Sequence, residues 1–146
     1  MQRSEVATIE AGCLTEARLI DMVFPEQTNH YGTLYGGQAL ALMDKAAFIA
    51  ASRYARRAVV TASSERVDFH VPVRNGQLVE LAARVVATGR TSITVEVKLY
   101  SEDLLTGERQ LATQGRFVLV AVSPDGRPAP VPVLPLVPAP VTPDGS

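Results

Sequence analysis

The stretch Gln38-Ala-Leu-Ala-Leu-Met-Asp44-Lys45-Ala-Ala-Phe-Ile-Ala-Ala51 decides the fold of this chain. Its spacing predicts a helix from Gln38 to about Arg57, because its many alanines favour helix and permit close packing. The central part is apolar almost all round, which indicates a helix enclosed by other structure. Asp44 is the exception, since a buried carboxylate is costly unless it is paired, hydrogen-bonded or used in chemistry.

After this helix the apolar period changes from 3.6 to 2, which indicates strands. Consecutive strands joined by short turns form an antiparallel meander, and a further strand is expected before the helix. One long helix with one apolar sheet predicts an α+β fold in which the antiparallel sheet wraps the helix. The predicted strands are Leu14–Phe24, a segment around Val67–Val71, Val79–Val85, Ile93–Leu99 and Arg109–Val122.

The length of 146 residues favours a single domain, which we predict over residues 1–122. The composition changes at residue 123, because eight of the ten prolines lie between Pro124 and Pro143. Proline removes backbone donors and cannot continue a helix or a central strand. Residues 123–146 are therefore predicted to form an extended or disordered tail.

The composition excludes several classes of protein. A net charge of −1, from 14 basic and 15 acidic residues, predicts neither a nucleic-acid partner nor binding to an anionic membrane. The single cysteine, Cys13, excludes an internal disulfide and a cysteine-rich metal site. There is no signal-peptide pattern, and no uncharged apolar run reaches the roughly 18 residues of a membrane helix. A cytoplasmic location is the expectation.

Two glycines at the start of the helix put a backbone donor on the same face as Asp44. Gly37 and Asp44 are seven residues apart, which places them within about 20° of each other and about 10 Å apart along the axis. In the first turn the Gly37 N–H would be unpaired, and it could bind a carbonyl oxygen that becomes negative during acyl transfer. Glycine also lets a substrate approach the backbone closely, and we count Gly36 among the expected substrate-binding residues.

Asn29 lies one loop upstream, and its side-chain amide can donate to an oxyanion or orient a water. Asn29, the Gly37 N–H and Asp44 would together supply an oxyanion site and a general base or nucleophile. That set is sufficient to hydrolyse an activated acyl compound such as a thioester without a metal. Asp44 lies too far along the helix to meet a carbonyl bound at Gly37 of the same chain unless the substrate lies along the helix. A second copy of the chain could instead present its own Asp44 across an interface.

Each of these residues also has a simpler explanation. Asp44 could be a buried or interface carboxylate paired with Lys45 or with a distant arginine. Asn29 could be a turn former, a common role of asparagine. His30 and His70 fit structural or solvated roles, and two histidines without acidic partners at ligand spacing make a poor metal site. We therefore predict no metal.

Several motifs occur in a fixed order along the chain. They are Thr28-Asn-His-Tyr-Gly-Thr-Leu-Tyr-Gly-Gly37 with Met43-Asp44, Val60-Thr-Ala-Ser63 with Asp68-Phe69, Pro72-Val73 with Gly76, Thr88-Gly-Arg-Thr-Ser92, and Phe117–Val122 with Asp125-Gly-Arg-Pro128. In this order they resemble the hotdog-fold acyl-CoA thioesterases over roughly residues 12–132. The resemblance is closest to the bacterial short- and medium-chain acyl-CoA hydrolases, which are related to eukaryotic acyl-CoA thioesterases of the brain type.

The resemblance implies a hotdog fold and a homodimer whose sheets join edge to edge, with two active sites at the interface and assembly into tetramers or hexamers. It implies that Asp44 is the general base or nucleophile, that Asn29 faces it from the other subunit, and that the Gly37 N–H polarises the thioester carbonyl. It implies no cofactor, since coenzyme A is part of the substrate. A turn is expected near the CoA moiety, formed by Gly89, Arg90, Thr91 and Ser92.

One departure from the family concerns a basic residue that many relatives carry just before the proline matching Pro72. This chain has Val71 there. Contacts to the CoA phosphates are then left to Arg90, to Arg74, or to the pair Arg56 and Arg57.

We therefore predict hydrolysis of acyl-CoA to a free carboxylic acid and CoA. The sequence leaves open whether Asp44 activates a water or attacks the thioester to form a transient anhydride. A non-catalytic acyl-CoA binding module that uses the same groove is the alternative. A related dehydratase is disfavoured, because the His/Asp pair on which its chemistry usually depends has no place in this chain.

Overall fold

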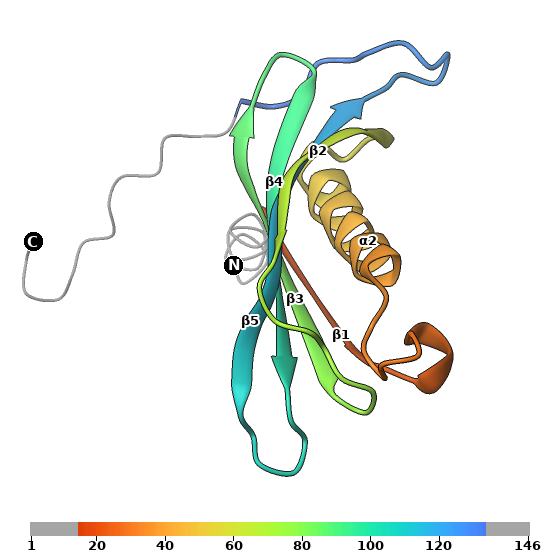
Figure 1. Cartoon of the computed structure of the whole chain (residues 1–146). Helices are drawn as coiled ribbons and strands as arrows, with labels where there is room; N and C mark the ends of the chain where they lie inside the picture. Colours follow the sequence, from red (N-terminus) through yellow and green to blue (C-terminus); the bar gives the residue numbers. More distant parts are fainter. Residues whose placement is uncertain (1–14, 134–146) are drawn as a thin grey trace, which may run out of the picture.

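The computed structural model of the chain describes residues 15–133, which form one long helix packed on one face of a five-stranded antiparallel sheet (Figure 1). The strand order is β1-β3-β4-β5-β2, so the first two strands of the sequence occupy opposite edges. This arrangement confirms the predicted fold class. The elements are β1 Glu16–Met22, the 3₁₀ helix η1 Pro25–Gln27, α2 Gly36–Ala55, β2 Val59–Phe69, β3 Leu78–Thr88, β4 Ser92–Glu102 and β5 Arg109–Ala121. Cys13, Leu14 and residues 134–146 lie outside the described residues.

The meander of β3, β4 and β5 follows from the alternation of the sequence. The odd-numbered residues from Val79 to Val85 in β3 and from Ile93 to Ser101 in β4 are buried beneath α2, and Leu81, Val95 and Leu99 are completely buried. Leu81 pairs with Leu99 in the antiparallel ladder, so the apolar sets of the two strands lie in register on one face. The predictions for these strands are confirmed, and even-numbered residues form the opposite, more polar face.

The helix α2 begins at Gly36, two residues before its predicted start, and ends at Ala55. It ends there because Arg56 adopts a left-handed backbone with φ of 54°. The Arg56 N–H still bonds to the Ser52 carbonyl oxygen at 2.8 Å, which caps the last turn.

Among residues 15–133, the sheet covers one side of α2 and nothing covers the other. Met43, Ala46 and Ala47 are completely buried, because they face the sheet. On the other side Lys45 is exposed and Phe48 keeps 45% of its surface accessible. The prediction of a helix enclosed all round is therefore wrong for a single chain. The exposed aromatic side chain of Phe48 makes this side of α2 a surface that a partner can bury.

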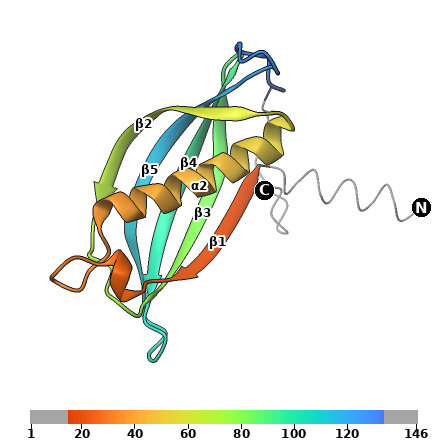
Figure 2. The ribbon, with the colours of Figure 1, turned by 90° about the vertical axis from the view of Figure 1, so that its right-hand side faces the viewer.

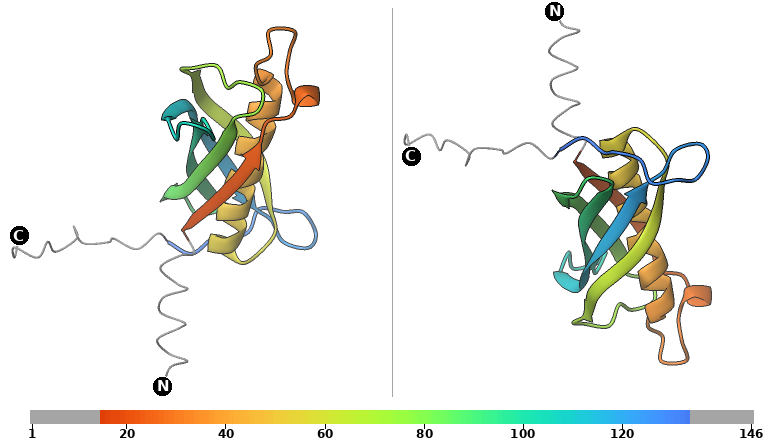
Figure 3. Two further views of the ribbon diagram at one scale, coloured as in Figure 1. Left: turned by 90° about the horizontal axis from the view of Figure 1, so that it is seen from below. Right: turned by 90° about the horizontal axis from the view of Figure 1, so that it is seen from above.

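The edge strand β2 differs from its prediction. It pairs with β5 alone, and every residue from Val60 to Arg66 is exposed. Phe69, predicted to alternate inward, is 55% exposed, and Val71 lies beyond the strand. The simple alternation fails because β2 has two irregularities in its register with β5. The sheet also curls so that β2 lies beside α2 rather than flat beneath it (Figures 2 and 3).

One of these irregularities explains the glycine in the middle of β5. β2 bulges between Glu65 and Asp68, where Arg66 has a positive φ of 41°. A Cβ added to Gly115 would lie 2.8 Å from Val67 Cγ2 and 3.2 Å from Val67 Cα. The bulge can therefore press against β5 only where the facing residue lacks a side chain.

Replacing Gly115 by alanine is expected to destabilise the fold by about 1–3 kcal/mol, because the added methyl group overpacks against a neighbouring backbone. Urea unfolding of the purified variant measures the change. Val67→Ala removes the closer of the two clashing groups, so combining both substitutions should recover part of the loss. Equal stability of Gly115→Ala and the parent chain would contradict this account of the bulge.

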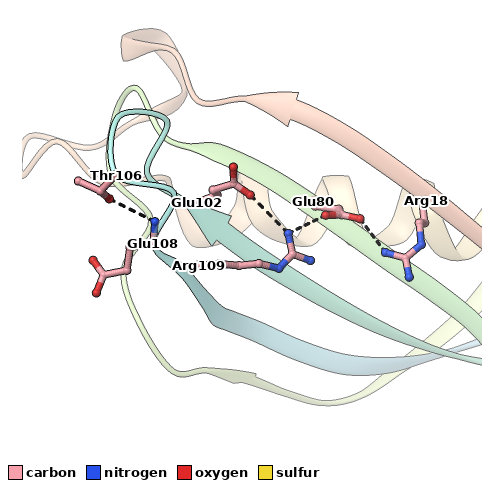
Figure 4. Close-up of polar contacts among 6 residues, drawn as sticks. All are labelled: Arg18, Glu80, Glu102, Thr106, Glu108 and Arg109. Atoms are coloured by element: carbon pink, nitrogen blue, oxygen red, sulfur yellow. Dashed lines mark hydrogen bonds and ion pairs between the residues drawn. The ribbon is translucent and has the colours of Figure 1, made fainter.

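The face of the sheet that points away from α2 carries a chain of ion pairs (Figure 4). Arg18 Nη1 lies 2.6 Å from Glu80 Oε2, and Arg109 Nη1 lies 2.7 Å from Glu80 Oε1. The Arg109 guanidinium also lies 3.6 Å from Glu102 Oε1 and stacks 4.4 Å from the centre of the Tyr100 ring. These contacts tie together strands β1, β3, β4 and β5.

The two arginines make this network sensitive to acid. The hydrogen bond from Arg109, followed by the contact with Arg18, lowers the pKa of Glu80 against the opposing effect of burial. A lowered pKa in the folded state means that the stabilisation is complete at neutral pH and is lost as the pH falls through the folded-state value. Glu80→Gln is therefore expected to cost about 1 kcal/mol at pH 7, and progressively less below about pH 4.

Thermal unfolding at several pH values tests this expectation. Glu16→Gln is the matched control on the neighbouring strand, since Glu16 is exposed and forms no ion pair within residues 15–133. A loss at Glu80→Gln that stays constant down to pH 3 would show that the network does not depend on the carboxylate charge.

Candidate active site

The start of α2 presents free backbone donors. The first helical hydrogen bond runs from the Ala39 N–H to the Tyr35 carbonyl at 3.0 Å, so the N–H groups of residues 36–38 precede the helical ladder. No atom lies within 4 Å of the point where a Gly37 side chain would begin. A substrate can therefore approach the backbone at Gly37 closely, at the positive end of the helix dipole.

Asp44 lies two turns further along α2 and is half-buried. Its Oδ1 accepts a hydrogen bond of 2.7 Å from the hydroxyl of Thr61 on β2. Within residues 15–133 it forms no ion pair with Lys45 or with any arginine. The explanation of Asp44 as a paired structural carboxylate therefore finds no support. One oxygen is fixed by Thr61, and the other is left for a further partner.

Gly37, Asp44 and Thr61 line one hollow of about 340 Å³ between α2 and β2. The structure therefore brings together two of the predicted site residues and adds a third. The rest of the lining is apolar or small and polar, formed by Leu40, Ala41, Ala62, Ser63, Ser64 and Phe117. Another hollow of about 350 Å³ lies over the β2 bulge, but the pair Arg66 and Asp68 in its lining bind each other at 3.3 Å.

Thr61 is a site residue that sequence reasoning missed. It stands in the motif Val60-Thr-Ala-Ser63, which was noted without any role for its hydroxyl. The only local signal is a run of small hydroxyl-bearing residues in a strand that follows the Asp44 helix. The contact joins residues 17 positions apart, and it depends on where β2 passes beside α2.

Asn29 occupies the turn that its simpler explanation suggests. Its Oδ1 accepts hydrogen bonds from the Tyr31 N–H at 2.9 Å, the Thr33 N–H at 3.2 Å and the Thr33 hydroxyl at 3.1 Å. Its Nδ2 donates no hydrogen bond within the described part of the chain, and Asn29 does not line the hollow with Asp44. The turn fixes the side chain by its oxygen and leaves the amide donor available.

The turn Gly89–Ser92 lies away from this hollow, at the opposite end of α2 from Gly37 (Figure 1). A Cβ on Gly89 would lie 2.6 Å from Ser92 Oγ, so any larger residue there requires the Ser92 side chain to rotate. Arg90 is exposed there, while Arg74 lies at the other end, where it bridges to Thr33 of the Asn29 turn. A single chain therefore does not unite the predicted substrate-binding turn with Gly37 and Asp44.

Residues 15–133 contain no group of three or more His, Cys, Asp or Glu side chains placed to hold a metal ion. None of their helices is long and apolar enough to cross a membrane.

Known proteins share this sequence pattern. The family model of the thioesterase superfamily matches residues 31–108. An uncharacterized acyl-CoA thioester hydrolase of Bacillus subtilis, YkhA, is 43% identical over 110 residues, which cover 75% of this chain and 64% of that protein. The acyl-CoA thioester hydrolase YciA of Salmonella typhimurium is 36% identical over 121 residues, which cover 81% of this chain and 91% of that protein.

Solved structures share the fold. The acyl-CoA hydrolase of Staphylococcus aureus in complex with butyryl-CoA, CoA and CoA disulfide matches with a TM-score of 0.78 and 34% identity, covering 81% of this chain and 72% of that one. A hexameric acyl-CoA thioesterase matches with a TM-score of 0.80 and 43% identity, covering 84% and 80%. Three further structures of the Staphylococcus aureus enzyme each carry a single substitution by alanine, of an aspartate, a threonine or an asparagine. The resemblance drawn from the motifs is confirmed, and the chain belongs to the thioesterase superfamily.

Proposed function

We propose that this chain hydrolyses acyl-CoA thioesters to a carboxylic acid and CoA, with Asp44 as the general base. The observation that carries the proposal is the shared hollow, which is lined both by Gly37, whose N–H precedes the helical ladder, and by Asp44. This arrangement pairs an oxyanion donor with a base, which is the minimum that acyl transfer to water requires.

The reaction follows from the two positions. The thioester carbonyl oxygen accepts a hydrogen bond from the Gly37 N–H, and the helix dipole favours the charge that develops on it. Asp44 takes a proton from a water that attacks the carbonyl carbon. The tetrahedral intermediate then collapses, the C–S bond breaks, and the CoA thiolate leaves with its electron pair and takes up the proton that Asp44 removed from water. Thr61 positions Asp44, because its hydroxyl holds Oδ1 and turns the second oxygen toward the water.

The spacing of the three side chains supports this assignment. In the Staphylococcus aureus hydrolase the substituted asparagine precedes the substituted aspartate by 15 positions, and the substituted threonine follows it by 17. Asn29, Asp44 and Thr61 have the same separations of 15 and 17 positions. A chance match of residue type and both intervals would be unusual, so we assign the same three positions here.

We further propose that the active unit is a homodimer joined along the free edges of β2. Within residues 15–133 that edge pairs with no further strand, and α2 lies beside it, since Thr61 of β2 bonds to Asp44 of α2. A twofold axis between two β2 strands makes both strands and both helices antiparallel. The start of α2 at Gly37 in one subunit then faces the C-terminal end of α2 in the partner. The Asn29 amide is available to act in the partner's site. Assembly of such dimers into a hexamer is the higher state we propose.

The alternative remains a module that binds acyl-CoA without hydrolysing it. Release of free thiol from a panel of acyl-CoAs, from acetyl to palmitoyl and including an aromatic acid, separates the two functions. We expect steady thiol release from at least one member of the panel. Calorimetric binding of an acyl-CoA without any thiol release would reject hydrolysis and favour the binding module.

A further inference from the structure

The first part of the proline-rich tail is bound to the body of the protein. After β5 the chain makes a turn in which the Ser123 N–H bonds to the Arg127 carbonyl at 2.8 Å. The Ala129 N–H then bonds to the Ala121 carbonyl at 2.8 Å, and the Val131 N–H bonds to the Arg90 carbonyl at 2.9 Å. We call residues 128–133 the clasp, because they connect the end of β5 with the turn Gly89–Ser92.

The clasp is also attached to the end of α2. The Tyr54 hydroxyl donates a hydrogen bond of 2.6 Å to the Pro132 carbonyl, and a side-chain hydrogen bond joins Tyr54 to Thr88 at the end of β3. Ala129, Val131 and Tyr54 are each less than 10% exposed, at 3%, 9% and 8%. Burial raises the pKa of Tyr54 against the effect of Thr88, so the phenol keeps its proton and remains a donor.

The proline pattern fits this attachment. Pro128, Pro130 and Pro132 alternate with residues 129, 131 and 133. The two N–H groups between these prolines, at Ala129 and Val131, both form the hydrogen bonds described above. The prolines therefore stand where no backbone donor is used, and their fixed φ lowers the entropy lost when the segment becomes ordered.

The end of the molecule that the clasp holds together is rich in arginine. Four arginines at this end form no ion pair within residues 15–133: Arg53, Arg56, Arg57 and Arg90. The one carboxylate nearby in the clasp and its turn, Asp125, is bound to Ser123 and to Arg127. A chain with a net charge of −1 thus places four cations without a carboxylate partner at one end of its described part.

Arg56 strengthens this interpretation. It occupies the left-handed position after α2 with φ of 54°, where glycine or asparagine is ordinarily preferred. An arginine there keeps a strained backbone and places a cation at the negative end of the helix.

We propose that the clasp is a positioning element, which holds the Arg90 turn against the end of α2 so that these arginines bind the phosphate groups of the CoA moiety. The inference rests on the proposed function and deepens it. In the antiparallel dimer this end of one subunit faces the Gly37 end of its partner, so an acyl-CoA whose thioester lies at one Gly37 extends its phosphates toward the other subunit's arginines. The same geometry selects Arg90 with Arg56 and Arg57, rather than Arg74, as the phosphate contacts.

Two variants loosen the clasp without touching an arginine. Val131→Pro removes the N–H that bonds to Arg90 in a segment already suited to proline, and Tyr54→Phe removes the bond to Pro132. Val133→Pro is the matched control, because Val133 is 83% exposed and its N–H forms no hydrogen bond within the described residues. We expect each loosening variant to raise the KM for acyl-CoA about three- to tenfold with kcat unchanged. The control should match the parent chain.

Acyl-pantetheine lacks the nucleotide and its phosphates, so its kcat/KM should be the same in all four proteins. Equal losses with acyl-CoA and acyl-pantetheine would show that the clasp only supports the fold, and no loss with either would also overturn the proposal. If the parent chain releases no thiol from any acyl-CoA, the proposed function fails. Calorimetric binding of CoA itself then tests the clasp. We expect a Kd three- to tenfold larger in Val131→Pro than in the parent chain, and an unchanged Kd would overturn the proposal.

Discussion

Replacing Asp44 by asparagine is expected to lower kcat for acyl-CoA hydrolysis by a factor of about 100 to 10,000. Asparagine keeps the shape of the side chain and can still accept the Thr61 hydrogen bond, but it cannot take a proton from water. Thr61→Val should cause a smaller loss of about tenfold, because it removes one hydrogen bond to a charged group while the carboxylate remains. Thiol release under saturating substrate measures both effects.

The control for Asp44→Asn is Asp21→Asn, which removes the same charge from an exposed position on β1. Asp21→Asn should leave kcat unchanged, and circular dichroism should show the same fold in all variants. Turnover in Asp44→Asn close to that of the parent would reject Asp44 as the base and return it to a structural role.

Mixing two inactive variants is expected to restore activity. Asn29→Ala and Asp44→Asn each damage both sites of a homodimer, if each site takes Asn29 from one subunit and Asp44 from the other. In a mixed dimer one site then carries both damaged residues and the other carries none. Random mixing of equal amounts makes half of the dimers mixed, so about one quarter of the parent activity should return.

The two variants are denatured together, refolded and assayed for thiol release against each variant refolded alone. A mixture of Asp44→Asn with Asp44→Ala serves as the control, because no dimer in it contains an intact site. Recovery no greater than in this control would place Asn29 and Asp44 of each site in the same subunit, or remove Asn29 from the chemistry.

The sequence predicted those strands in which apolar residues face the core and polar residues face away from it at regular alternation. In β3 and β4 alternate residues face the core beneath α2, so Leu81 and Val95 could be assigned to the core from their spacing alone. The two glycines at positions 36 and 37 likewise lay close to the start of the helix, which begins at Gly36 rather than at the predicted Gln38.

The predictions from sequence failed where the exposure or the contacts of a residue depend on a segment that is distant in the chain. In the described part of the chain β2 has a neighbouring strand on one side only, so its residues from Val60 to Arg66 are exposed, and the bulge at Arg66 breaks the alternation. The bond from Thr61 to Asp44 depends on the curl of the sheet beside the helix. The separation between Gly37 and the Arg90 turn could not be predicted either, because the order of motifs along the chain does not show at which end of the sheet each motif lies.

The strand order limits where this chain can change in length. β1 and β2 are consecutive in sequence but lie at opposite edges, so the segment between them crosses the sheet and carries α2 with it. One residue added to α2 between Gly37 and Asp44 would turn Asp44 by about 100° and shift it by about 1.5 Å relative to Gly37, so that Gly37 and Asp44 would no longer face the same hollow. Residues 104–107 instead join the neighbouring strands β4 and β5 in an exposed turn. Insertions and deletions that preserve hydrolysis are therefore confined to such turns and to the ends of the chain.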